Sequence, residues 1–174
     1  MLEFIKDREI YEKVICGWIP EAKRFLWLAT ADLKDLHVDK RGRMVPFLEV
    51  LSDLVRNRVE IRLLHAKEPG VRFRRDFDKY PNLTNGMEMM LCPRVHIKSA
   101  VIDGQFAYTG SANLTGAGMG AKSAVRRNFE TGIVTDDKKI VEQIMKQIND
   151  IWVGQHCLQC GRKRYCASYK DLNR

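Results

Sequence analysis

The spacing of apolar residues along the first third of the chain predicts a helix, a strand and a second helix. Apolar positions recur at helical spacing over residues 3–18, and Pro20 separates that stretch from a buried apolar run over 24–31. The polar stretch around 32–43 predicts a loop, and helical periodicity returns over 45–56. The order is therefore helix, strand, loop and helix.

The same two periodicities continue to alternate in the rest of the chain. The other expected elements are strands over 59–65, 87–91, 95–102, 106–109 and 129–135, and helices over 69–80 and 136–153. Strands that alternate with helices predict an α/β fold, here an α/β/α sandwich with a mixed, largely parallel central sheet. We expect one domain over 1–153, followed by a cysteine-rich basic tail over 154–174 that packs on it.

Composition is that of a globular protein, with 45% apolar and 30% charged residues among 174. No apolar run approaches the roughly 20 residues that a membrane-spanning helix needs. The first 15 residues mix acidic and basic side chains with apolar ones and lack the pattern of a signal peptide. These features predict a cytoplasmic protein.

The formal net charge is +8, and part of the excess is clustered. Residues 56–79 hold eight Lys and Arg against four Asp and Glu, and residues 156–174 hold five against one. Clustered positive charge favours a polyanionic partner, nucleic acid (DNA or RNA) first and an anionic membrane surface second. The alternative is a solvated face with surplus basic residues.

Candidate chemistry is concentrated in residues 95–113. His96 and Lys98 lie two apart in an apolar segment, so along a strand they would share one face. Histidine can act as a nucleophile or general acid–base, and a fixed ammonium can stabilise a phosphoryl group in its transition state. Ser111 and Asn113 follow the next strand and can donate to phosphate oxygens. Each residue alone has an ordinary structural explanation, and Asp103 with Gly104 is first of all a turn.

Taken together, the pattern His96-x-Lys98-x4-Asp103-x6-Gly110-Ser111-x-Asn113 resembles the HKD motif of the phospholipase D superfamily. The later Asn128-Phe129-Glu130 resembles the Asn-x-Glu that such proteins carry at the start of the next strand. The resemblance extends over roughly residues 10–153. It implies a phospholipase D-like fold and a phosphodiesterase.

The resemblance also implies a role for each matched residue. His96 would be the nucleophile that forms a phosphohistidine, while Lys98 and Asn113 would bind the phosphate. Ser111 would support the phosphate-binding loop, and Glu130 would accept a hydrogen bond from the imidazole. Asp103, the remaining motif residue of the catalytic set, would be architectural rather than chemical.

The full motif occurs once, whereas larger members of the superfamily carry it twice in one chain. His65-x-Lys67 repeats the first pair, but Arg72 stands where the motif has its acid, so we interpret it as a coincidence. A second histidine must then come from a second copy, which predicts a homodimer with one composite active site. This arrangement is similar to that of the small single-motif bacterial endonucleases of the superfamily.

Cys157, Cys160 and Cys166 lie within ten residues of the tail, and the Cys-x2-Cys-Gly spacing is typical of a metal knuckle. Cys92 is the first candidate for a fourth ligand, and His156 is the second. The set predicts a structural zinc site without a catalytic role, because four protein ligands leave no open position. An iron–sulfur cluster and free thiols remain alternatives. Cys16, in the first helix, is interpreted as a core thiol.

Two groups of arginines are candidate substrate contacts. Arg126 and Arg127 precede the Asn-x-Glu, and a further group falls on the helix expected over 69–80. That group consists of Arg72, Arg74 and Arg75. For both groups the alternative is a solvated surface.

Three functions are therefore open. The first is a metal-independent phosphodiesterase that hydrolyses nucleic acid, most simply an endonuclease, with no cofactor for catalysis. The second is a phospholipase or phosphatidyl transferase, since the same chemistry serves a phospholipid. The third is a non-enzymatic module that binds nucleic acid, although every motif position is filled.

Overall fold

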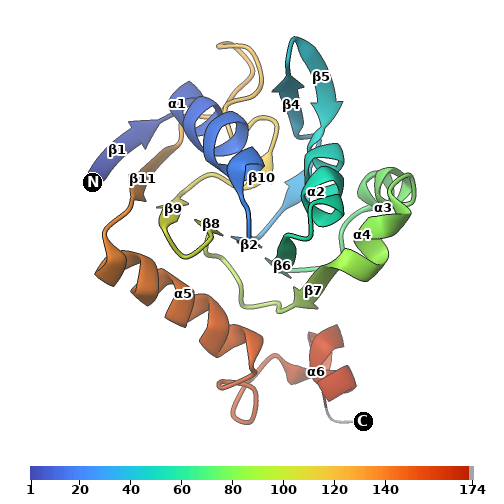
Figure 1. The fold of residues 1–174 in the computed structure, drawn as a ribbon. Helices are drawn as coiled ribbons and strands as arrows, with labels where there is room; N and C mark the ends of the chain where they lie inside the picture. The colour runs from blue at the N-terminus through green and yellow to red at the C-terminus, as the bar shows by residue number, and fades with distance from the viewer. Residues whose placement is uncertain (173–174) are drawn as a thin grey trace.

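The computed structural model describes residues 1–172, except the side chains of Arg72 and of residues 170–172, and its centre is a seven-stranded sheet (Figure 1). Across the sheet the strands are β1 (Leu2–Lys6), β11 (Thr131–Thr135), β9 (Phe106–Gly110), β8 (Ser99–Ile102), β2 (Phe25–Thr30), β6 (Glu60–His65) and β7 (Met87–Leu91). Only β8 and β11 run against the other five strands. The expected mixed, largely parallel sheet is confirmed in this sense, although the parallel neighbours are limited to β2, β6 and β7.

Helices cover both faces of the sheet, so the α/β/α sandwich is confirmed (Figure 1). One face carries α1 (Arg8–Ile10), its π-helical continuation η1 (Tyr11–Trp18), the 3-10 turn η2 (Ile19–Glu21), α2 (Phe47–Arg56), α3 (Val71–Phe77) and α4 (Pro81–Gly86). The other face carries α5 (Lys138–Trp152). Alternate residues of the strands supply the two cores: Leu28 and Leu63 face the first layer, whereas Ala29 and Leu64 face α5.

The N-terminus differs from the helix expected over 3–18, because its first residues form β1. Phe4 is 65% exposed and Ile5 is 1% exposed, which is the alternation of an edge strand with one buried face. β1 pairs antiparallel with β11, and Phe4 lies opposite Ile133. The free edge of β11, far away in sequence, therefore decides the structure of a segment whose apolar pattern fits either element.

The loop expected around 32–43 contains short strands instead. β3 (Leu33–Lys34) pairs with β10 (Leu114–Thr115), while β4 (His37–Lys40) and β5 (Arg43–Pro46) form an antiparallel hairpin. Arg41 and Gly42 occupy the turn with φ of 55° and 80°. Two successive residues with positive φ match the two-residue turns that fit the twist of a hairpin.

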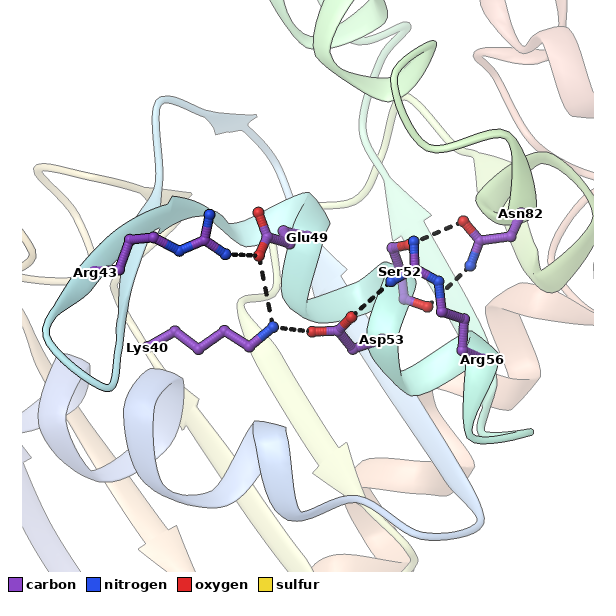
Figure 2. A network of polar contacts seen from close by, with 7 residues as sticks. All are labelled: Lys40, Arg43, Glu49, Ser52, Asp53, Arg56 and Asn82. Carbon is purple, nitrogen blue, oxygen red and sulfur yellow. Dashed lines mark hydrogen bonds and ion pairs between the residues drawn. The ribbon is translucent and has the colours of Figure 1, made fainter.

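Polar contacts attach this hairpin to α2 and α2 to α4 (Figure 2). Glu49 of α2 receives Arg43 at 2.6 Å and Lys40 at 3.5 Å. Ser52 Oγ donates to Asn82 Oδ1 at 2.8 Å, and Asn82 Nδ2 donates back to the Ser52 carbonyl at 2.9 Å. The charged part of this network is exposed and contributes little stability, whereas the paired amide contacts hold α4 in register with α2.

The tail follows α5 and ends in η3 (Lys163–Tyr165) and α6 (Ala167–Leu172), which lies beside β7 and the end of α5 (Figure 1). Within residues 1–172, no helix combines the length and the apolar character that crossing a bilayer would take.

Candidate active site

The motif residues other than Asp103 gather at one end of the sheet, where β2 and β9 end and β8 and β11 begin. His96 and Lys98 lie in an extended segment just before β8, so the strand expected over 95–102 begins only at Ser99. The Lys98 carbonyl still accepts from Gly110 N at 3.1 Å, which holds the segment against the end of β9. Val95 and Ile97 pack into the core beneath α5, and His96 and Lys98 therefore face away from it.

Lys98 is buried and holds its ammonium group against the imidazole of His96. Lys98 Nζ lies 3.2 Å from both ring nitrogens and donates to the His96 carbonyl at 2.6 Å. His96 itself is exposed. Burial lowers the pKa of Lys98, and the charge of Glu130 acts in the opposite direction. The pair thus combines an accessible imidazole with a partly desolvated positive charge.

Asn113 is oriented by the end of β2. Its Oδ1 accepts from the backbone N–H groups of Ala31 and Asp32, both at 3.2 Å, and from Thr30 Oγ1 at 3.3 Å. Because two backbone N–H groups point at this oxygen, the orientation of the amide is determined, and Nδ2 is left as a donor. No described residue accepts a hydrogen bond from this Nδ2. The amide is therefore available to a phosphate oxygen.

Ser111 and Asn128 hold the carboxylate of Glu130. Ser111 Oγ donates to Glu130 Oε2, and Asn128 Nδ2 donates to Glu130 Oε1 at 3.0 Å. The backbone of Glu130 is fixed as well, because Glu130 N donates to Asp7 Oδ1 at 2.9 Å. The expected hydrogen bond from the His96 imidazole to Glu130 is not formed within this chain. The negative charge of Glu130 instead raises the pKa of Lys98.

Asp103 lies at the opposite end of β8, in the turn that leads to β9, and has no contact with His96. Its carboxylate accepts backbone N–H groups from Lys23 at 2.9 Å, Arg24 at 2.7 Å and Phe25 at 2.9 Å. Burial raises the pKa of Asp103, but these three hydrogen bonds and the charge of Arg24 outweigh it, so the net shift is downward. Asp103 thus fixes the start of β2 and belongs to the fold rather than to the reacting groups.

The family model described as "Cardiolipin synthase, PLD-like domain" matches residues 15–152, which is most of the chain. The chain belongs to the phospholipase D-like family. A search of curated protein sequences gave no match.

Solved structures agree with the phospholipase D-like fold. NucT from Helicobacter pylori superposes with a TM-score of 0.63 and 15% identity, covering 86% of this chain and 95% of NucT. The phospholipase D family member Nuc from Salmonella typhimurium gives 0.65 and 16%, covering 87% of this chain and 93% of Nuc. Phosphatidylserine synthase from Haemophilus influenzae gives 0.62 and 14%, covering 89% of this chain and 39% of the synthase. At these identities the likeness concerns the fold.

The two groups of candidate arginines in this phospholipase D-like chain lie on different elements, one in a loop and the other on α3. Arg126 is exposed and Arg127 half-buried in the loop that leads to Glu130, which keeps both near the motif residues in the chain. Arg74 and Arg75 are exposed on α3, and Arg74 pairs with Glu68. The side chain of Arg72 lies outside the described residues.

His65, which heads the partial repeat of the motif, is fully buried at the end of β6. Its Nδ1 contacts the Lys67 carbonyl, and burial lowers the pKa of His65. A histidine without access to solvent does not form a second reacting group. The second histidine expected for this chemistry is therefore not supplied by the repeat.

The cysteines of the tail lie near Cys92 without forming a ready ligand set. Burial raises the pKa of Cys157, and the thiols of Cys166, Cys92 and Cys160 raise it further. Among residues 1–172, no three His, Cys, Asp or Glu side chains are arranged to hold a metal ion. The predicted zinc site is therefore not preformed. Cys16 is half-buried against the core of the first helical layer, as expected.

Sequence reasoning missed the groups that orient the motif residues. The backbone N–H groups of residues 31 and 32 fix Asn113, and Asp7 fixes Glu130. A signal for the first existed, because Thr30-Ala31-Asp32 follows the carboxyl end of a buried strand. No local signal marks Asp7, whose φ of 47° is set by the junction between β1 and α1.

Proposed function

We propose that this chain is a metal-independent phosphodiesterase that hydrolyses nucleic acid, most simply as an endonuclease, with a homodimeric active site. The observation that carries the proposal is the Lys98 ammonium, 3.2 Å from the ring nitrogens of an exposed His96. The pre-oriented amide of Asn113 adds a donor for a phosphate oxygen. Together they give a nucleophile and two oxygen-binding groups at one end of the sheet.

In the first step, a ring nitrogen of His96 attacks phosphorus and the bond to the leaving oxygen breaks. Lys98 and Asn113 donate to the non-bridging oxygens, whose charge is redistributed as the phosphoryl group transfers. The leaving oxygen needs a proton, and the partner subunit's His96 supplies it. The product is a phosphohistidine and a free alcohol end.

In the second step, water attacks the phosphohistidine. The same imidazole of the partner subunit, now neutral, takes a proton from the water while the P–N bond breaks. His96 is regenerated and the phosphate end is released. Lys98 and Asn113 supply the electrostatic stabilisation, so the scheme requires no metal ion.

Charge and architecture support nucleic acid as the substrate. The net charge of +8 favours a polyanion, and Arg126 and Arg127 precede Glu130 in an accessible loop. The proteins named NucT and Nuc are matched over nearly their whole length, whereas the phosphatidylserine synthase is matched over 39%. We therefore place cleavage of nucleic acid ahead of phosphatidyl transfer.

The test incubates the purified protein, with EDTA present, with labelled single- and double-stranded DNA, RNA, a bis-aryl phosphodiester and phosphatidylcholine. His96→Ala should abolish cleavage of every substrate, and the control His37→Ala, an exposed histidine of the β4–β5 hairpin, should retain it. Full activity in His96→Ala would refute the chemistry. Cleavage of phosphatidylcholine without cleavage of nucleic acid would establish the lipid alternative.

The composite site has its own test. Light scattering at the assay concentration should give the mass of a dimer. Mixed dimers of wild-type and His96→Ala chains should lose most of their activity, because their shared active site contains one imidazole in place of two. A protein that is monomeric and fully active would refute the shared site while leaving a phosphodiesterase.

A further inference from the structure

The tail is attached to the segment that leads into the active site. Cys166 Sγ donates to the Leu91 carbonyl at 3.3 Å, and Leu91 N donates to Ser168 Oγ at 2.9 Å. Arg162 Nη1 donates to the Pro93 carbonyl at 2.9 Å. These contacts lie on either side of Cys92, four residues before His96 in the chain. Whatever stabilises the tail therefore also fixes the approach to the candidate nucleophile.

In the tail, the cysteines are less exposed than two of the large apolar side chains. Its cysteines are covered to different degrees, with Cys166 6% exposed and both Cys157 and Cys160 half-buried. Two of its large side chains are exposed, Leu158 at 79% and Tyr165 at 66%. Leu158 and Tyr165 therefore add little to the attachment of the tail, whereas Cys166 is buried where the tail meets β7.

The backbone around Cys160 is shaped for a sulfur anion. Cys160 N donates to the Cys157 carbonyl at 3.1 Å, which closes a tight turn and brings the two side chains onto one side. Arg162 N then donates to Cys160 Sγ at 3.4 Å. An amide directed at sulfur stabilises a thiolate, the form in which cysteine binds a metal ion.

The fourth sulfur comes from the catalytic domain. Cys166 Sγ donates to the carbonyl of Leu91, the residue before Cys92, which places the last thiol of the tail beside this segment. Cys92, Cys157 and Cys160 also line one cavity of about 690 Å³ between the tail and α5. The sulfurs are not in ligating positions, so binding of an ion requires side chains of this turn to change rotamer.

We propose that Cys92, Cys157, Cys160 and Cys166 bind one zinc ion, which anchors the tail over 154–172 to the segment preceding His96. The four thiols would bind as thiolates and release their protons to solvent. Four protein ligands leave no open position, so the ion would be structural. The proposal concerns a site apart from the motif residues and holds whether or not the chain cleaves nucleic acid.

Zinc suits this donor set better than a cluster would. Tetrahedral sulfur ligation is typical of zinc and of iron–sulfur centres. Cys157 and Cys160 lie on one tight turn, and Cys166 contacts the end of β7 beside Cys92. One small ion therefore needs less displacement than a cluster of several atoms.

The test measures metal in the purified full-length protein by elemental analysis. Wild type should contain about one zinc ion per chain, and so should His96→Ala, which separates this result from the proposed activity. Cys92→Ser and Cys157→Ser should lose the zinc. Cys16→Ser, which changes a cysteine of η1 outside the cluster, is the matched control and should retain it.

A second measurement does not depend on the variants folding. Wild type stripped with chelator should take up Co²⁺ and show the charge-transfer and intense d–d absorption of tetrahedral thiolate coordination. Iron with acid-labile sulfide, a Cys157–Cys160 disulfide in freshly reduced protein, or four titratable thiols that ignore added Zn²⁺ would each overturn the proposal. Retention of zinc in Cys92→Ser would overturn the role of that residue and with it the anchor.

Hydrogen exchange tests the consequence for the fold. Removal of zinc should speed amide exchange in the tail and in residues 91–98, because the anchor joins these segments. Amides of β2 and β6, in the centre of the sheet, should exchange as before. Equal acceleration across the whole sheet would contradict a local anchor.

Discussion

Replacement of Asp103 by Asn tests whether the motif's acid is architectural. Asp103 is 8% exposed, and its carboxylate accepts three backbone N–H groups, two at Oδ1 and one at Oδ2. Asn can retain the two bonds at a single oxygen, but its NH₂ group would then face Lys23 N–H, donor against donor. The φ of 56° at this position suits Asn, so the change adds little backbone strain.

The magnitude follows from the bonds that are lost and weakened. A hydrogen bond to a charged acceptor contributes about 1.5–3 kcal/mol, and a neutral one about 1 kcal/mol. Loss of the Lys23 bond and weakening of the other two give an expected destabilisation of about 2–4 kcal/mol. For a chain of this size that corresponds to a drop in Tm of roughly 5–15 °C.

The assay is urea denaturation followed by circular dichroism, with phosphodiesterase activity measured at a temperature where both proteins are folded. Asp76→Asn, at a surface pair with Lys79, is the control and should change stability by less than about 0.5 kcal/mol. Asp103→Asn should retain activity within about a factor of two, since β8 separates the residue from His96. Unchanged stability with lost activity would refute the architectural role.

The pH dependence provides an independent check. Because the pKa of Asp103 is lower in the folded protein than its ordinary value of 3.8, its contribution is present above that value. The contribution is lost as the pH falls through the folded pKa. The difference in the free energy of unfolding between wild type and Asp103→Asn should therefore be largest at neutral pH and should decrease below about pH 4.

Three further outcomes are expected. Lys98→Met should reduce cleavage at least about 100-fold because the transition state loses its fixed charge, while urea denaturation should show unchanged or higher stability, since a buried charge has been removed. Asn113→Asp keeps the oxygen that the β2 end binds but replaces the Nδ2 donor, so kcat should fall about 100-fold with the circular dichroism spectrum unchanged. Substrate affinity should fall steeply with salt, and Arg126→Ala should reduce the slope of that dependence by about one, whereas an unchanged slope would remove Arg126 from the contacts.

Much of the fold could be predicted because local sequence features, such as helix caps and turn residues, favour the same structure as the tertiary packing. The helix expected over 136–153 is α5, and Asp137 caps it by accepting from Lys139 N at 3.0 Å and Ile140 N at 3.1 Å. The β8–β9 hairpin follows from its Asp-Gly turn. In both cases the residues that decide the structure are neighbours in sequence.

The predictions of secondary structure are wrong where residues far away in the sequence determine the structure. Phe4 and Ile5 fit a helix or a strand equally well, and only the open edge of β11 selects the strand. His96 fits a strand as far as the pattern goes, yet the segment before Ser99 has no ladder partner beyond the bond from Gly110 to Lys98. The orientation of Asn113 depends on backbone N–H groups, which no sequence pattern displays.

The geometry separates the HKD motif into two parts with different physical roles. His96 and Lys98 approach β8 from one end, and Asp103 leaves it at the other, where it fixes the start of β2. β2 then returns to the first end and orients Asn113 through the backbone at 31–32. The acid therefore contributes to the site only through the strand that it anchors. A chain that kept Asp103 and lost His96 would keep the fold without the reaction, so activity must be tested at His96 and Lys98.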